Sequence, residues 1–220
     1  MISFAFLDPI IEALPLLLKG AALTLQISFL GILLGLSLGT LLGLFNCNKL
    51  KIPVLNKFIT SYVIVFRGTP IFVQLLIVYF ALPQALGIDF SPFFAGVFTL
   101  GLNSSAYISE IVRGGINSIA VGQWDACFSL GYGKAKALRY IILPQTFKNV
   151  LPSITNELAT LIKESSILIY IGVPELLKVS KDVVARELNP IEIYLTAAVL
   201  YLIMTSAVAF LAKVWERRLA

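Results

Sequence analysis

The sequence lacks the side chains that most catalytic and metal sites need. It contains no histidine among its 220 residues, which excludes histidine-based metal sites and Ser/His catalysis. Its two cysteines, Cys47 and Cys127, stand apart without a Cys-x-x-Cys spacing, so neither a zinc site nor a disulfide framework is indicated. No Gly-x-x-x-x-Gly-Lys-Ser/Thr phosphate loop is present, because Gly131, Gly133 and Lys134 do not supply its spacing. We therefore expect a chain that is not an enzyme and that carries no metal or cofactor of its own.

Charged side chains are also scarce. They make up 13% of the chain, whereas 58% of its residues are hydrophobic and the mean hydropathy is +0.91. A soluble domain of this length could not cover itself with so little polar surface. Several apolar runs reach the roughly 20 residues needed to cross hydrocarbon, and the first is too long for a removable signal peptide. The composition predicts an all-α protein of the lipid bilayer, with a single transmembrane domain over residues 1–220 and no nucleic-acid partner.

Five apolar segments divide the chain, at about residues 14–45, 58–82, 92–112, 146–173 and 191–211. The first has a glycine at every fourth position, namely Gly31, Gly35, Gly39 and Gly43. On a helix these glycines line one face and let another backbone approach closely. That face either packs inside the chain's own bundle, which we favour, or forms a dimer seam. Residues 174–190 are expected to form a polar loop.

Lysine and arginine fall mostly on one side of these five spans. With the N-terminus outside, four lie on the outer side, Lys19, Lys178, Lys181 and Arg186, and eleven on the inner side, Lys49, Lys51, Lys57, Arg113, Lys134, Lys136, Arg139, Lys148, Lys213, Arg217 and Arg218. The positive-inside rule therefore predicts an N-out, C-in arrangement, which an odd number of spans requires. The long polar stretch at about residues 117–145, between spans three and four, then faces the cytoplasm.

Polar side chains interrupt the second and third spans. The run Phe-Arg-Gly-Thr-Pro at residues 66–70 predicts a break or kink, and Arg67 within it needs a partner. Asn103, at the middle of the third span, favours a pathway for a polar solute, because a zwitterion that sheds its water must be compensated. Ser104 and Ser105 beside it favour hydrogen bonding between helices instead.

The fourth span carries Lys163 and Glu164 side by side. Adjacent residues on a helix point about 100° apart, so these two cannot simply neutralise each other. One of them can reach the carboxylate or amine of a solute. Together with Asn103, Arg67 and Gln74 they form our candidate set of pathway residues.

The polar stretch before the fourth span predicts a helical hairpin. Residues 122–130 read as a short helix with Trp124 and Phe128 on one face, and Gly131 is placed to end it in a left-handed turn. A second helix, at residues 134–142, is expected to stop or bend at Pro144. Such a hairpin either docks into a groove on another protein or rests on the lipid surface. Trp124 and Phe128 pack either on the chain itself or on that partner.

The same stretch resembles the EAA signature of ATP-binding-cassette importer permeases. That signature is Glu-Ala-Ala, a glycine four residues later and then Ile-x-Leu-Pro, and the matching residues here are Asp125, Ala126, Cys127, Gly131, Ile141, Leu143 and Pro144. Aspartate replaces the glutamate and cysteine replaces the second alanine. Gly122 and Gln123 are also similar to the family. Residues 67–70, 103–115, 156–158 and 163–165 look like the subfamily that carries polar amino acids.

The resemblance implies a five-span permease of the bacterial plasma (inner) membrane that imports polar amino acids. A second permease subunit, identical or paralogous, would complete the pathway, and two ATPase subunits would supply ATP and Mg. An extracytoplasmic amino-acid-binding protein would deliver the solute, and residues 174–190 either meet it or are simply solvated. The coupling helix would contact the ATPase through Gly122, Gln123, Trp124, Asp125, Ala126, Gly131, Leu143 and Pro144. The alternative is an ATP-independent channel or ion-coupled secondary transporter, in which Lys163 or Glu164 carries a proton or ion.

Overall fold

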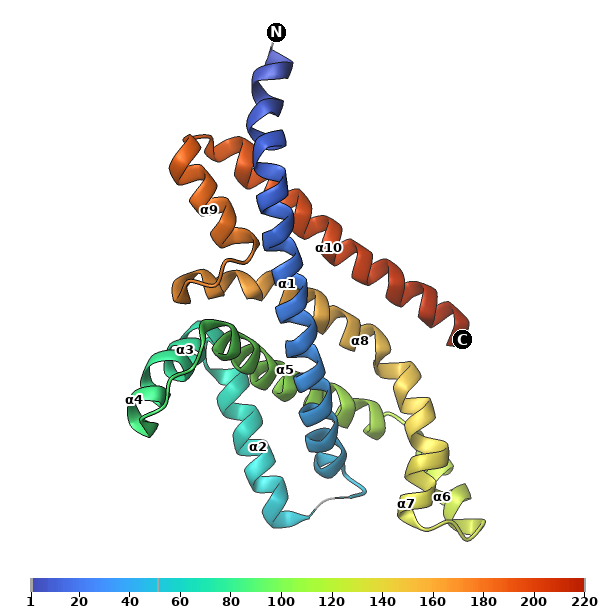
Figure 1. Cartoon of the computed structure of the whole chain (residues 1–220). Coiled ribbons are helices and arrows are strands. Elements are labelled where there is room, and N and C mark those ends of the chain that lie inside the picture. Colours follow the sequence, from blue (N-terminus) through green and yellow to red (C-terminus); the bar gives the residue numbers. More distant parts are fainter. Residues whose placement is uncertain (1, 51, 220) are drawn as a thin grey trace.

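The structure is a computed structural model that describes the backbone of residues 2–50 and 52–219 and the side chains of residues 8–50 and 52–218. Lys51, which entered the charge count, lies outside the described residues. Within the described part every regular element is a helix, which confirms the all-α prediction. Figure 1 shows α1 (Ile2–Asn46) running through the length of the molecule, with the other helices packed around it at steep angles.

The remaining elements follow in chain order. They are α2 (Pro53–Gly68), α3 (Ile71–Leu76), the π-helix η1 (Ile77–Ala81), α4 (Leu82–Leu86), α5 (Pro92–Asn117), α6 (Val121–Ser129), α7 (Lys134–Ala137), the π-helix η2 (Leu138–Ile142), α8 (Leu143–Glu164), the 3₁₀-helix η3 (Ser165–Ile171), α9 (Leu176–Glu187) and α10 (Pro190–Leu219). The first and last helices extend beyond the apolar segments that were expected at residues 14–45 and 191–211.

The glycine face of α1 packs against α5 inside the same chain. A Cβ on Gly39 would lie 2.6 Å from the carbonyl oxygen of Ser105, and one on Gly43 would lie 2.6 Å from that of Ser109. Only glycine permits so close an approach between the two backbones. The expectation that this face is used within the chain's own bundle is confirmed.

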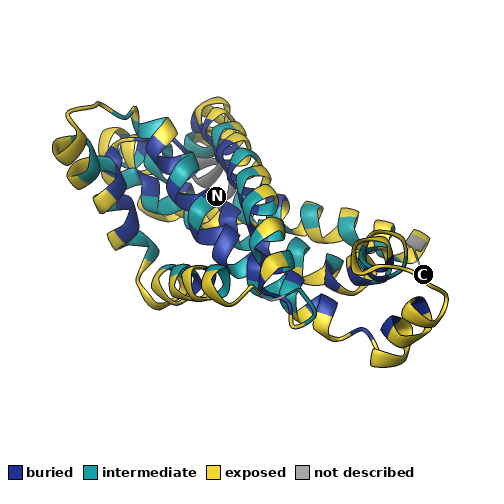
Figure 2. Ribbon diagram, turned by 90° about the horizontal axis from the view of Figure 1, so that it is seen from below, coloured by how far each residue is buried: buried dark blue, intermediate teal, exposed yellow. Residues whose placement is uncertain are grey.

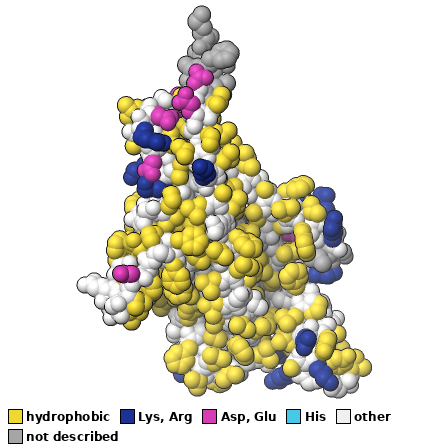
Figure 3. All heavy atoms as spheres, viewed as in Figure 1, with side chains coloured by type: hydrophobic (Ala, Val, Ile, Leu, Met, Phe, Trp, Pro, Cys, Tyr) yellow, Lys and Arg dark blue, Asp and Glu magenta, His cyan; other side chains and the backbone are white. Residues whose placement is uncertain are grey.

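The surface fits a bilayer environment over much of its area. Hydrophobic side chains cover most of the face in Figure 3, and charged ones gather near its upper end and its right and lower margins. Figure 2 shows that buried residues line the central helices, whereas their outward faces are exposed. Asp8–Asn46 and Pro190–Arg218 are each long and apolar enough to cross a membrane. The helix pair Pro53–Gly68 and Ile71–Leu86 passes the same criterion only as one bent unit.

The predicted break in the second apolar segment is confirmed. The axis turns by 105° between α2 and the helix that begins at Ile71, so the apolar segment expected at residues 58–82 consists of two helical parts that meet at this break. Pro70 has no backbone N–H for the helical ladder, and Thr69 before it is extended, with φ −117° and ψ 146°. The break therefore follows from local chemistry.

The polar loop expected at residues 174–190 is wrong, because residues 176–187 form helix α9. The carboxylate of Glu175 accepts hydrogen bonds from the backbone N–H groups of Leu177, at 3.0 Å, and Lys178, at 2.8 Å, and so caps the helix. Leu176 and Val183 are buried against the second hydrophobic cluster of the molecule. The many charges of this stretch lie on the other face of an amphipathic helix and conceal it in the sequence.

The helix that begins at Lys134 does not stop before Pro144. α7, η2 and α8 follow one another without interruption to Glu164. Pro144 lies in the first turn of α8, and the π-helical turn before it accommodates the missing donor: the N–H of Leu143 donates to the carbonyl of Leu138, five residues back. The proline is therefore absorbed by a local widening of the helix.

Candidate functional site

The first candidate region is the α6–α7 hairpin, residues 121–142, at one end of the molecule. Gly131 has φ 80°, the left-handed conformation that was predicted for it. The N–H of Tyr132 donates to the carbonyl of Cys127 at 3.0 Å, and that of Gly131 donates to Phe128 at 2.9 Å. This pair of bonds is the Schellman motif, which ends α6 and reverses the chain. A side chain at Gly131 would meet strain from the backbone conformation although the space around it is open.

The hairpin is anchored to its own chain by Trp124. Only 2% of that side chain is exposed, and it belongs to the main hydrophobic cluster together with Cys127 and Ala137. Phe128, whose ring centroid lies 6.2 Å from that of Trp124, remains 39% exposed. The sequence left open whether these two aromatic side chains pack on the chain itself or face a partner. Trp124 packs inside the chain, whereas Phe128 faces outward.

The opposite face of the hairpin is free to meet a partner. Most of the predicted coupling residues are exposed there, namely Gly122, Gln123, Asp125, Ala126, Gly131 and Pro144, whereas Leu143 is half-buried. Leu130 and Tyr140 add large exposed apolar surface, with 77% and 60% of each accessible. A polar and apolar face on a short rigid element, with its back packed on the chain, is suited to docking.

The second candidate region surrounds the break between α2 and α3. The Gln74 amide N–H group donates to the carbonyls of Phe66, at 2.8 Å, and Thr69, at 3.2 Å, and to the Thr69 hydroxyl at 2.9 Å. The Asn103 amide donates to the Gln74 side-chain oxygen at 3.0 Å and to the Phe66 carbonyl at 3.2 Å. The structure thus joins two of the five predicted pathway residues directly. Both side chains donate hydrogen bonds to backbone carbonyl groups that the break in the helix leaves without a helical partner.

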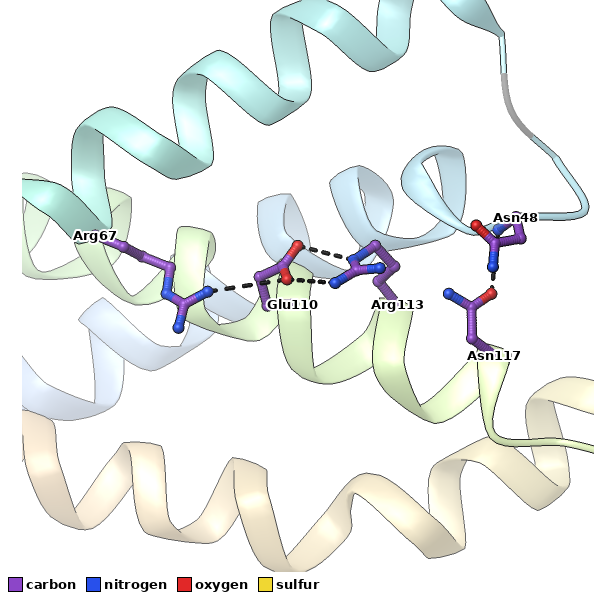
Figure 4. A network of polar contacts seen from close by, with 5 residues as sticks. All are labelled: Asn48, Arg67, Glu110, Arg113 and Asn117. Atoms are coloured by element: carbon purple, nitrogen blue, oxygen red, sulfur yellow. Dashed lines mark hydrogen bonds and ion pairs between the residues drawn. The ribbon is translucent and has the colours of Figure 1, made fainter.

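Arg67, on the other side of the break, has the partner that its position requires. Its guanidinium lies 3.9 Å from the carboxylate of Glu110 and 5.1 Å from the ring centroid of Tyr107. Glu110 is held more tightly by Arg113, whose guanidinium donates two hydrogen bonds to it at 2.9 and 2.6 Å. Figure 4 shows the three charged side chains in a row, with Arg67 from the end of α2 and Glu110 and Arg113 from α5. Glu110 and Arg113 lie three residues apart on α5 and form a local ion pair.

The third candidate region lies on α8. Glu157 is 9% exposed and forms no ion pair with any lysine or arginine in the described part of the chain. Glu164 is partly buried, and Lys163 is exposed. Glu157 was missing from the predicted set, although its spacing of seven residues from Glu164 places both on one helix face.

The sequence has relatives of known kind. The family described as "binding-protein-dependent transport system inner membrane component" matches residues 31–220, well over half of the chain. The chain belongs to this family. The resemblance drawn from its sequence motifs is therefore confirmed.

Two curated relatives and one solved structure agree with this membership. The chain is 42% identical over 212 residues to the arginine transport system permease protein ArtQ of Bacillus subtilis, covering 95% of this chain and 94% of that protein. It is 39% identical over 208 residues to the glutamine transport system permease protein GlnP of Escherichia coli K12, covering 94% of each. The crystal structure of an amino acid ABC transporter with histidines matches with a TM-score of 0.87 at 37% identity, over 95% of this chain and 96% of that one.

Proposed function

We propose that this chain is the permease subunit of an ATP-binding-cassette importer that carries polar amino acids across the bacterial plasma membrane. The observation that carries the proposal is the α6–α7 hairpin, which combines a Schellman turn at Gly131, a buried Trp124 and an exposed docking face, in a member of the permease family. Relatives named for arginine and glutamine transport support the class of solute.

Five spans in an N-out, C-in arrangement are part of the proposal. The spans would be α1, α2 with its bent continuation, α5, α8 and α10. The broad hydrophobic surface in Figure 3 and the excess of lysine and arginine near the α6–α7 hairpin and the C-terminal tail support this topology. It places the hairpin in the cytoplasm, where ATP is.

The hairpin would dock on an ATPase subunit and transmit its closure. Gln123, Asp125 and Ala126 are exposed on the face that is available for contact, whereas Trp124 would act indirectly by fixing α6 to the permease. Two ATPase subunits with ATP and Mg, a second permease subunit, identical or paralogous, and an extracytoplasmic amino-acid-binding protein would complete the machine. Closure on one side and opening on the other then alternate the exposure of the pathway.

The pathway itself would run past Glu157, Glu164 and Lys163. A buried carboxyl group without an ionic partner is costly inside a membrane protein, and such groups mark the routes of polar solutes. Glu157 is suited to the ammonium or side-chain N–H of an amino acid, and exposed Lys163 is suited to its carboxylate. Asn103 and Gln74 would shape the route by holding the break between α2 and α3.

The test is ATP hydrolysis by the complete complex in vesicles, with the binding protein loaded in turn with each polar amino acid. We expect stimulation by one loaded binding protein, and uptake that requires ATP. The rival is an ATP-independent channel or ion-coupled transporter. Uptake that collapses with the proton gradient and ignores ATP would establish that rival and defeat our proposal.

A further inference from the structure

A cavity of about 350 Å³ lies between the end of α1, the face of α2 and the last turns of α5. We call it the inner cavity and define it by Asn56, Thr60, Arg67, Glu110 and Arg113, which line it. It lies toward the same end as the α6–α7 hairpin, because α5 continues from Glu110 to Asn117 and α6 begins at Val121. In Figure 4 the charged side chains of the cavity lie between α2 and α5.

The charges of the inner cavity do not balance. It contains two guanidinium groups, Arg67 and Arg113, against the single carboxylate of Glu110. Arg113 occupies both oxygens of that carboxylate, whereas Arg67 reaches it only at 3.9 Å and is 43% exposed. A guanidinium presents five N–H donors in a planar fork that matches a carboxylate. The cavity therefore has an excess of one positive charge and spare donors that suit a carboxylate anion.

The other end of the cavity offers an acceptor. The side-chain oxygen of Asn56 is buried and has no hydrogen-bond partner among the described residues. Buried acceptors of this kind are normally satisfied, and a ligand's N–H group would satisfy this one. Asn56, Thr60 and Arg67 share one face of α2, since steps of four and eleven residues both return to nearly the same helix angle. They extend over about 16 Å at 1.5 Å per residue.

We propose that the inner cavity binds a polar α-amino acid in an extended pose, with its head group at Arg67 and Glu110 and its side-chain N–H donor at Asn56. The carboxylate would pair with the spare donors of Arg67, and the α-ammonium with Glu110. This site rests on the proposed function, which supplies both the class of solute and the cytoplasmic orientation. Its place in transport is the release step, after the solute has passed Glu157.

The experiment measures binding of radiolabelled L-arginine and L-glutamine to the permease–ATPase complex in nanodiscs, without the binding protein. Asn56→Leu removes the unpaired acceptor and should weaken binding about tenfold, since a hydrogen bond from a charged or amide donor is lost. Thr60→Val, a nearly isosteric change in the same cavity, should weaken it less. Ser61→Leu is the matched control, because Ser61 is exposed on the same helix and does not line the cavity. It should leave binding unchanged.

A second ligand tests the head-group end. Agmatine is arginine without its carboxylate, so it should compete poorly against labelled L-arginine for the wild-type complex. Equal binding of agmatine, or wild-type binding by folded Asn56→Leu, would overturn the proposal. Bound phosphatidylethanolamine that disappears in Asn56→Leu, with no amino acid bound by either protein, would assign the cavity to a lipid head group and overturn it as well.

The proposed function and the inner site fail in different ways. Stimulation of ATP hydrolysis by a loaded binding protein, together with unchanged binding in Asn56→Leu, would remove only the inner site. Loss of both the stimulation and all amino acid binding in the wild type would remove the proposed function itself. The thermal melting temperature of each variant, compared with that of Ser61→Leu, separates loss of the site from loss of the fold.

Discussion

At the scale of single residues, Gly131 is a position of the α6–α7 hairpin that tolerates a side chain poorly. Its left-handed φ of 80° is what allows the two Schellman bonds to form, and no neighbouring atom lies within 4 Å of where a Cβ would be. The constraint is therefore conformational. Gly133, two residues later, has a φ of −73°, which any residue adopts, and the space around it is also open.

This contrast gives a matched pair of variants. Gly131→Asp should abolish uptake while leaving membrane insertion intact, because the side chain opposes the left-handed turn at a cost of about 1 kcal/mol or more and alters the docking face. Gly133→Asp adds the same charge nearby and should retain most of the activity. Uptake by vesicles and the amount of inserted protein are the measurements. Normal uptake by Gly131→Asp at a normal protein level would contradict the docking role of the turn.

Lys163 carries a second prediction at this scale. We expect Lys163→Ala to change the affinity for the solute or the choice among amino acids, because it removes an exposed cation beside Glu164 on α8. Lys148→Ala, an exposed lysine toward the other end of the same helix, serves as the control. Uptake kinetics over several amino acids report the effect. Identical KM values for all of them in Lys163→Ala would place this lysine outside the solute's route.

At the scale of elements, the contact of α1 with α5 holds the bundle together. It is a backbone-to-backbone contact made at glycines, so its strength depends on distances that a single methyl group would change. Gly39 and Gly31 lie on the same face of α1 but differ in the space that a Cβ atom would have. A Cβ on Gly39 would lie 2.6 Å from a carbonyl oxygen, whereas one on Gly31 would lie 3.4 Å from the nearest atom, on Leu100.

Alanine should therefore have opposite effects at these two positions. Gly39→Ala should destabilise the protein by about 1–3 kcal/mol, because the helices must separate. Gly31→Ala should be neutral or stabilising, since alanine is favoured over glycine in a helix by about 1 kcal/mol. Thermal melting in detergent distinguishes them. A melting temperature of Gly39→Ala equal to that of Gly31→Ala would show that α1 and α5 do not need this approach.

At the scale of the whole molecule, the sequence predicted the elements whose signals are local. The all-helical class, the break near Pro70 and the left-handed turn at Gly131 each depend on neighbouring residues alone. Features that depend on which helices meet were harder to predict. Nothing local distinguishes Trp124, which is buried, from Phe128, which is exposed.

The loop expected at residues 174–190 was wrong for a physical reason. α9 was read as a loop because a helix that is charged on one face and buried on the other resembles a solvated segment until its neighbours are known. The pathway role of Asn103 and Gln74 stays a prediction. The structure adds that Asn103 donates to the Phe66 carbonyl and to the Gln74 side-chain oxygen at the break, 37 and 29 residues away along the chain. Glu157 was overlooked because only tertiary burial marks it.

The uninterrupted helix from Lys134 to Glu164 has a mechanical consequence. At 1.5 Å per residue these residues cover about 45 Å of helix, and Pro152 inside α8 removes one backbone donor at a place where Figure 1 shows the helix changing direction. One end of the helix forms part of the α6–α7 hairpin, and the other carries Glu157 and Lys163. Movement of the hairpin would therefore be carried along this helix toward these side chains, with Pro152 as the place where the helix can bend. The π-helical turn at residues 138–142 lies between the hairpin and α8. It is the place where the helix can wind or unwind by part of a turn.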